Sequence, residues 1–133
     1  MTWRQLYNEA KKHINERDIS PFIHGGQVAS AIETDKGNIY IGINFDTSCD
    51  LGSCAERNAI RTMLVNNETK IKRIVTIARD ELRPPCGACR EALMQLHKDS
   101  GEIEFLSSLK PIKTVKLKEL MPDWWGDKYF EEQ

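Results

Sequence analysis

Two short stretches decide how this chain is read: Cys-Ala-Glu-Arg at residues 54–57 and Pro-Cys-Gly-Ala-Cys-Arg at residues 85–90. Each opens a run of apolar residues at helical spacing, and the two predicted helices extend to about Val65 and about Lys98. A helix N-terminus presents unpaired backbone N–H groups and a positive dipole end, which favour a thiolate over a thiol. The cysteines of both stretches are therefore placed to bind a metal ion.

Cys54, Cys86 and Cys89 are the predicted ligands of one zinc ion per chain. Two helix starts side by side would give a tetrahedral ion three sulfurs and leave its fourth position open for water, as in catalytic zinc sites. Cys49, in the polar segment 45–52, is an alternative fourth ligand that would make the site closed and structural. A thiol–disulfide enzyme built on the C-x-x-C pair is a further alternative, although it leaves the first cysteine and its neighbouring glutamate unexplained.

Glu56 is the residue that makes the predicted metal site a candidate for catalysis. Residues two positions apart in a regular helix lie about 200° apart around its axis, so Cys54 must precede the first turn for both to converge. Glu56 can then act as base and acid in turn. Three thiolates on Zn²⁺ carry a net negative charge, which Arg57 and Arg90 are predicted to offset by donating hydrogen bonds to the sulfurs. The alternative is that both are ordinary surface arginines.

The rest of the pattern favours an α/β fold in which a mixed sheet lies between helices. Apolar spacing predicts a first helix from Trp3 to near Asp18, and a glycine pair then separates it from the strands. The expected strands are 27–33, 38–44, 71–78 and 102–106, with another around Ile112, and the last expected helix is 115–120.

Length and charge limit the possible functions. The 133 residues suit one domain spanning 1–133. The balance of 19 basic and 20 acidic side chains provides no net field for nucleic acid or an anionic membrane, and favours a small ligand. No run approaches the roughly 20 apolar residues of a membrane span, and the N-terminus lacks the apolar core of a signal peptide. A cytoplasmic protein is expected, in a reducing compartment where clustered cysteines more often bind metal than form disulfides.

The two stretches together resemble the paired signature of the cytidine deaminase family, H-x-E with P-C-x-x-C. Cysteine replaces the histidine here, as in the small family members that deaminate free nucleosides. The similarity extends to residues 28–31, 42–44 and 120–122. The resemblance implies a three-layer sandwich with a mixed five-stranded sheet and helices on both faces.

The resemblance also implies an activity, namely hydrolytic deamination of a cytosine-type nucleoside, from cytidine or deoxycytidine to uridine or deoxyuridine. Water activated by zinc would attack the ring carbon that bears the amino group, while Glu56 protonates the ring nitrogen and then the leaving amine. A homotetramer and a role in pyrimidine salvage follow from the same resemblance. A non-catalytic structural zinc module remains the alternative of a different class.

The substrate pocket departs from the family pattern. Asn44 matches the asparagine that binds a ribose hydroxyl, but Asp46 replaces the glutamate two positions later. The aromatic wall of the base is missing from residues 25–27, and Trp125 is the candidate replacement, across a subunit boundary; the alternative is that it packs in the core or an interface. The strand 28–31 also resembles the blasticidin S deaminase branch, which leaves that antibiotic or another amino-heterocycle as alternative substrates. His24 is a further candidate to approach the substrate.

Overall fold

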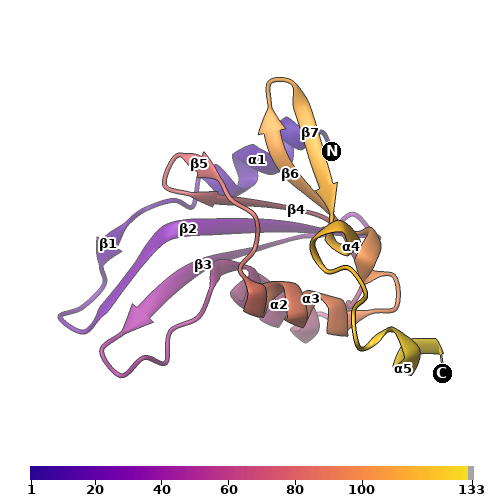
Figure 1. Cartoon of the computed structure of the whole chain (residues 1–133). Coiled ribbons are helices and arrows are strands. Elements are labelled where there is room, and N and C mark those ends of the chain that lie inside the picture. The colour runs from indigo at the N-terminus through magenta and orange to yellow at the C-terminus, as the bar shows by residue number, and fades with distance from the viewer. Residues whose placement is uncertain (132–133) are drawn as a thin grey trace.

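The computed structural model describes residues 1–131, which form one mixed sheet with helices on both of its faces (Figure 1). The strands run in the order β1-β2-β4-β6-β7, with β3 also paired to β2 and β5 to β4, and only β4 and β6 are parallel. The strands are β1 (Arg17–Asp18), β2 (Ile23–Thr34), β3 (Ile39–Thr47), β4 (Ile71–Ala78), β5 (Glu81–Leu82), β6 (Glu104–Leu109) and β7 (Ile112–Lys116). The helices are α1 (Trp3–Lys11), α2 (Ala55–Val65), α3 (Gly87–Leu96), α4 (Leu117–Leu120) and α5 (Asp127–Glu131), with a 3₁₀ turn at Ser100–Glu102.

The predicted α/β sandwich is confirmed, and its sheet has seven strands rather than five because two strands of two residues each, β1 and β5, extend β2 and β4. Helix α1 lies on one face of the sheet, and α2 and α3 lie on the other (Figure 1). The α1 face is filled by Leu6, Ala10, Ala31, Val75, Ile77 and Leu106. The opposite face is filled by Ile32, Ala59, Ile60, Met63, Ile71, Ile74, Leu93, Met94, Ile103, Phe105, Leu117 and Trp124.

The central strand β4 explains why the sheet is covered on both sides. Side chains alternate across a strand, so Val75 and Ile77 pack under α1 while Ile74 packs under α2 and α3. A strand buried on both faces has a nearly continuous apolar sequence, which is the pattern that predicted 71–78 as a buried strand. The observed bounds of β4 confirm that prediction.

The first helix is shorter than its spacing predicted, and this corrects the expected end near Asp18. Helix α1 ends at Lys11, and the chain then crosses to β2, where the Asn15 N–H donates to the Gly26 carbonyl at 2.9 Å. The glycine pair lies inside β2 rather than before it, where the pairing with β3 is irregular. Gly26 has a φ of 84°, a conformation that glycine adopts without the steric cost of a Cβ atom.

The C-terminal third also differs from the prediction. Residues 115–116 belong to β7, which pairs antiparallel with β6, so the expected helix 115–120 is reduced to the single turn of α4. Helix α5 follows the Trp124–Trp125 pair, where no regular element was expected. Val and Ile in alternation with lysine favour a strand once a partner is available, and β6, separated from β7 by only Lys110 and Pro111, is that partner. Propensity alone did not reveal the pairing.

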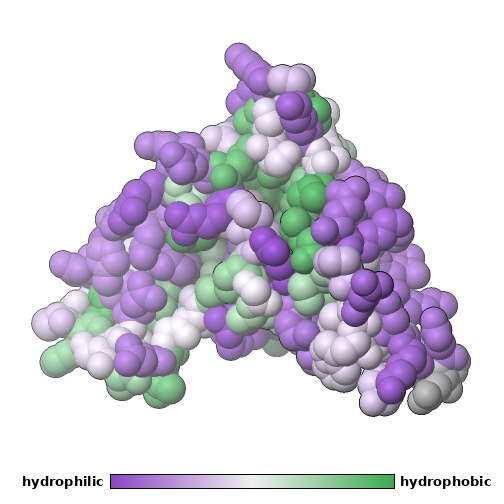
Figure 2. Space-filling view, in the orientation of Figure 1, coloured by the Kyte–Doolittle hydropathy of each residue, from purple (hydrophilic) through white to green (hydrophobic). Residues whose placement is uncertain are grey.

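Within residues 1–131, no helix is both long and apolar enough to cross a lipid bilayer. Figure 2 shows one face of the molecule, on which hydrophilic residues predominate and hydrophobic residues form smaller patches.

Gly42 of β3 can be used to test how closely α2 packs against the sheet. A Cβ atom at Gly42 would lie 2.1 Å from the carbonyl oxygen of Ala55 and 2.5 Å from the nitrogen of Ala59, both backbone atoms of α2. Gly42→Ala is expected to lower the free energy of unfolding by about 1–3 kcal/mol, because overpacking forces the helix outward. Urea denaturation measures this. Gly87→Ala, which adds its methyl group to open space, is the control, and equal midpoints for the two variants would contradict the expected clash.

Candidate active site

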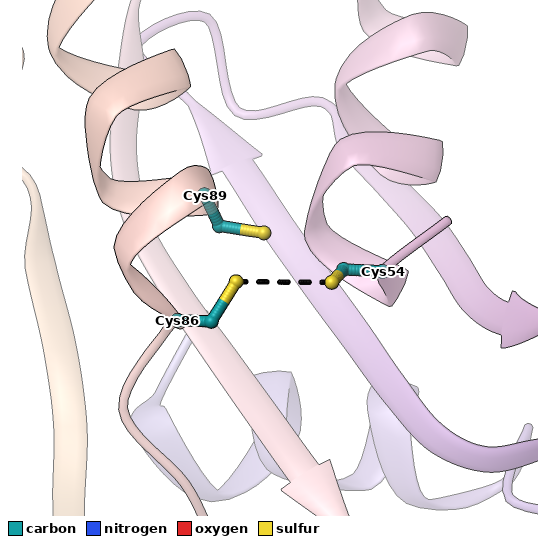
Figure 3. Close-up of side chains that lie close together, drawn as sticks. All are labelled: Cys54, Cys86 and Cys89. Carbon is teal, nitrogen blue, oxygen red and sulfur yellow. Dashed lines mark hydrogen bonds between the residues drawn. The ribbon is translucent and has the colours of Figure 1, made fainter. Parts of the chain in front are cut away.

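The three predicted ligands converge at the starts of two helices. Cys54 and Cys86 are the N-cap residues of α2 and α3, and Cys89 lies in the first turn of α3. Both caps have extended backbones, with ψ of 153° and 167°, and neither thiol makes a capping hydrogen bond. Cys54 therefore precedes the helical turn, as its convergence with Glu56 requires. Figure 3 shows the three sulfurs directed toward one another, one from α2 and two from α3.

The spacing of the sulfurs fits a zinc ion. The Sγ atoms of Cys54 and Cys86 are 3.8 Å apart, and all three Sγ atoms lie within 4.8 Å of one another. Sulfurs at tetrahedral positions about 2.3 Å from zinc would be separated by about 3.8 Å. Sulfur atoms are soft donors, and a site with three of them binds zinc in preference to calcium or magnesium. The cluster can thus hold zinc with three thiolates and leave one position open.

The residues beside the sulfurs have the chemistry that the metal site needs. Glu56 is only 4% exposed, and its Oε2 accepts a hydrogen bond from the Cys89 thiol at 3.6 Å. The Nη2 of Arg57 donates to the Cys54 sulfur at 3.4 Å, and this hydrogen bond raises the pKa of Arg57. A buried carboxylate and a cation thus both contact the sulfur cluster.

The two thiols of α3 have different acidities. Burial raises the pKa of the Cys89 thiol well above its usual range, and the charge of Glu56 adds to the effect. Burial also acts to raise the pKa of Cys86, but hydrogen bonds from the backbone N–H groups of Cys89 and Ala88 and from the thiols of Cys89 and Cys54 together outweigh it, and the pKa is lowered. The helix N-terminus therefore favours the Cys86 thiolate, whereas Cys89 needs the positive charge of a metal ion to lose its proton.

A cavity of about 410 Å³ adjoins the sulfur cluster. Asn44 and Asp46, both predicted to bind substrate, lie on its wall. The Oδ1 of Asn44 accepts the Val28 N–H at 3.0 Å, and Nε2 of Gln27 lies 3.4 Å from Oδ2 of Asp46. The complete lining is Gln27, Val28, Asn44, Asp46, Gly52, Ser53, Cys54, Ala55, Glu56, Arg57, Arg79, Arg83, Pro84 and Cys86.

The contact of Arg90 differs from the prediction, whereas a single chain does not test the contact that Trp125 is expected to make across a subunit boundary. The Nε of Arg90 donates to the carbonyl oxygen of Pro85 at 2.8 Å, so Arg90 holds the segment before Cys86, and no hydrogen bond within residues 1–131 joins it to a sulfur. The indole N–H of Trp125 donates to Glu91 of α3 at 2.9 Å, and Trp125 is 61% exposed rather than lining the cavity of its own chain.

The two remaining candidates also lie outside the cavity. Cys49 is exposed and hydrogen-bonds Thr47, and it is not part of the sulfur cluster. His24 lies between Asp18 and Glu16, with ring-nitrogen distances of 2.8 and 3.1 Å, and lines a separate, smaller cavity of about 220 Å³.

Sequence reasoning missed several residues of the cavity wall. Gln27 lies where the family's aromatic wall is absent, and Ser53 precedes the first ligand. Arg79 and Arg83 come from the β4–β5 hairpin and the segment after it. The nearness of both arginines to residues 85–90 in sequence was the signal that could have singled them out.

Cys49→Ala tests the alternative of a closed tetrad of cysteines. Because Cys49 is exposed and lies outside the cluster, the variant is expected to keep one zinc ion per chain and a midpoint of unfolding within the error of the parent. Metal analysis after dialysis and urea denaturation measure both quantities. A variant that loses zinc and unfolds would establish Cys49 as a ligand and the site as structural.

Comparisons with known proteins agree with this geometry. Residues 1–101 match the profile of the cytidine and deoxycytidylate deaminase zinc-binding region. Cytidine deaminase of Halalkalibacterium halodurans is 31% identical over 100 residues, 72% of this chain and 74% of its own. Cytidine deaminase of Sporosarcina psychrophila is 30% identical over 98 residues, 71% of each chain.

Solved structures show the same fold. Cytidine deaminase of Bacillus anthracis aligns with a TM-score of 0.70 and 26% identity over 97% of this chain and 93% of its own. That of Mycobacterium tuberculosis aligns with a TM-score of 0.77 and 21% identity over 95% and 98% of the two chains. The profile match covers more than half of the chain and includes all three converging cysteines. This chain belongs to the zinc-dependent cytidine and deoxycytidylate deaminase family.

Proposed function

We propose that the protein hydrolytically deaminates a cytosine-type nucleoside, in which water replaces the exocyclic amino group by a carbonyl oxygen and ammonia leaves. One observation carries the proposal: a buried carboxylate, Glu56, contacts a cluster of three thiols on the wall of a cavity large enough for a small molecule. The curated relatives are named cytidine deaminase, which supports the same reaction.

Each residue of the site has a separate proposed role in the reaction. Cys54, Cys86 and Cys89 would hold a zinc ion, which would supply the Lewis acidity that makes water a nucleophile at neutral pH. Glu56 takes a proton from that water and delivers it to the ring nitrogen as the hydroxyl group adds to the ring carbon. It then takes the proton of the added hydroxyl group, which becomes the carbonyl, and delivers it to the amino group, which leaves as ammonia. Arg57 reduces the negative charge of the thiolates and so maintains the acidity of the metal.

Asn44 and Asp46 are the proposed contacts of the sugar. The carbonyl oxygen of the Asn44 side chain is held by Val28, and this leaves the amide nitrogen to donate to a hydroxyl oxygen. The carboxylate of Asp46 accepts a hydroxyl hydrogen, and Gln27 beside it holds its orientation. The absence of an aromatic residue at 25–27 keeps blasticidin S and other amino-heterocycles as alternative substrates.

We also propose that the protein is a homotetramer, that residues 1–133 form a single domain, and that it is located in the cytoplasm. Trp125 and Tyr129 are 61% and 53% exposed, and apolar surface of this kind supports contact with a second copy. In such an assembly Trp125 would close the cavity of a neighbouring subunit. Both hydrophobic clusters share one sheet, which supports a single domain. Four unpaired cysteines support a reducing compartment.

The test is an assay of the zinc-loaded protein for ammonia release and ultraviolet change, with cytidine, deoxycytidine, cytosine, adenosine, guanine and blasticidin S. The proposal predicts turnover of cytidine or deoxycytidine and none of adenosine or guanine. Turnover of blasticidin S alone would keep the reaction and move the substrate to the alternative. Turnover of none of the cytosine compounds would contradict the proposed function.

A further inference from the structure

Helix α2 lies so close to β3 that one of its side chains reaches the backbone of that strand. The approach depends on Gly42, since a Cβ atom there would lie 3.1 Å from the carbonyl carbon of Asn58. The Nδ2 of Asn58 donates to the Ile43 carbonyl oxygen at 2.7 Å. Ile43 directly precedes Asn44, the proposed contact of the sugar. Asn58 therefore connects the helix that begins at Cys54 with the strand that carries the sugar contact.

Arg61, three residues further along α2, fixes the orientation of the Asn58 amide. Its Nη1 donates to Oδ1 of Asn58 at 2.6 Å. A guanidinium group only donates hydrogen bonds, so Asn58 must present its oxygen to Arg61 and its NH₂ group to the Ile43 carbonyl. Without Arg61 the amide would be free to turn, and its oxygen would then face the carbonyl oxygen of Ile43.

The same Nη1 atom also holds the segment before the first predicted zinc ligand. It donates to Oγ of Ser53 at 2.8 Å, and Ser53 is 9% exposed and lines the cavity. The backbone N–H and carbonyl of Ser53 bond those of Phe45 at 3.1 and 3.3 Å. The residues on both sides of Asn44 are thus connected to the start of α2, and Arg61 joins the two connections.

We propose that Arg61 is a positioning residue of this enzyme, which acts through Asn58 and Ser53. It keeps the Asn44 amide, and with it the sugar of the substrate, in a fixed position relative to the metal site. The role rests on the proposed deaminase function, although Arg61 itself is exposed and is not among the residues that line the cavity. Because hydrogen bonds weaken steeply outside a narrow range of distance and angle, a displaced Asn44 would bind the sugar poorly.

The experiment compares the zinc-loaded parent with Arg61→Met, which keeps an apolar stem and removes the N–H donors. It measures KM and kcat for cytidine, and the inhibition constant against cytidine of 2′,3′-dideoxycytidine, which lacks the 2′- and 3′-hydroxyl groups. The KM for cytidine is expected to rise about tenfold, within the cost of misplacing a substrate-binding group. Both kcat and the inhibition constant are expected to stay within about twofold of the parent, because only a contact with the sugar is weakened.

Asn58→Asp tests the same connection independently and does not depend on whether Arg61→Met folds. Aspartate still accepts from Arg61 but cannot donate to the Ile43 carbonyl, so KM for cytidine is expected to rise here too. Arg61→Lys is expected to recover part of the loss, because an ammonium group also only donates. Arg4→Met, which replaces an exposed arginine of α1 at the opposite face of the sheet, is the matched control and keeps the parent values.

Two results would overturn the positioning role and leave the deaminase function standing. One is an equal change for cytidine and 2′,3′-dideoxycytidine, which a general disturbance of the fold would cause. The other is a KM for cytidine that neither Arg61→Met nor Asn58→Asp alters. A parent protein that deaminates no cytosine compound would overturn the proposed function itself.

Discussion

Replacing Glu56 with glutamine is expected to lower kcat by about a thousandfold or more, within the range typical of a lost general acid–base group. Glutamine has nearly the shape of glutamate and still accepts a hydrogen bond, so the contact with Cys89 can persist. It cannot take a proton from water and deliver it to a substrate. Deamination of the best cytosine substrate, followed by ultraviolet absorbance, measures the loss.

The variant is informative only if its metal and its fold are retained. Glu56→Gln is expected to bind one zinc ion per chain and to have a thermal midpoint close to that of the parent, because Glu56 is not a ligand and its volume is conserved. Glu9→Gln, on α1 at the opposite face of the sheet from α2, is the control for the chemical change alone. A variant that turned over substrate near the parent rate would exclude Glu56 as the proton-transfer group.

Replacing Cys86 with alanine is expected to abolish stoichiometric zinc binding and, with it, activity. Zinc affinity should fall by more than the 10–100-fold typical when a residue that hydrogen-bonds a ligand is replaced, because here a ligand itself is removed. Cys86 is exposed, so the substitution leaves no hole in the hydrophobic core. The midpoint of unfolding is expected to fall only to that of the chelator-treated parent, because binding free energy that depends on the fold stabilises the fold.

Cys49→Ala is the matched control for this experiment, since it removes an exposed thiol outside the sulfur cluster. Zinc content by metal analysis and activity after readdition of zinc are the measurements. A Cys86→Ala protein that retained one tightly bound zinc ion and parent activity would show that the ion is held elsewhere in the chain.

The metal centre could be predicted from the sequence because its signals are local. Each of the two motifs lies at a helix start, and helix starts are visible in the spacing of apolar residues and in the cap positions. The requirement that Cys54 precede the turn of α2 followed from helix geometry, and the observed ψ of 153° agrees with it. The three sulfurs within 4.8 Å of one another are the consequence.

The cavity wall could not be predicted in the same way, since it depends on pairing between distant segments. Gln27 and Arg79 meet because Val28 of β2 pairs with Ala78 at the end of β4, and nothing near either residue in the sequence indicates the other. Arg90 was expected on a sulfur because it adjoins Cys89, yet residues adjacent on a helix point in different directions, and its guanidinium contacts Pro85. The end of α1 was predicted wrongly for the same reason: residues 17–18 were expected near the end of the helix, but they pair with β2.

The central claim is a zinc ion held by three cysteines with one position left for water. X-ray absorption at the zinc edge of the purified protein measures the coordination most directly. The account predicts three sulfur neighbours at about 2.3 Å and one oxygen or nitrogen neighbour at about 2.0 Å, with the same spectrum for Cys49→Ala. Four sulfur neighbours, or a spectrum that changes when Cys49 is replaced, would contradict it and make the site a structural one.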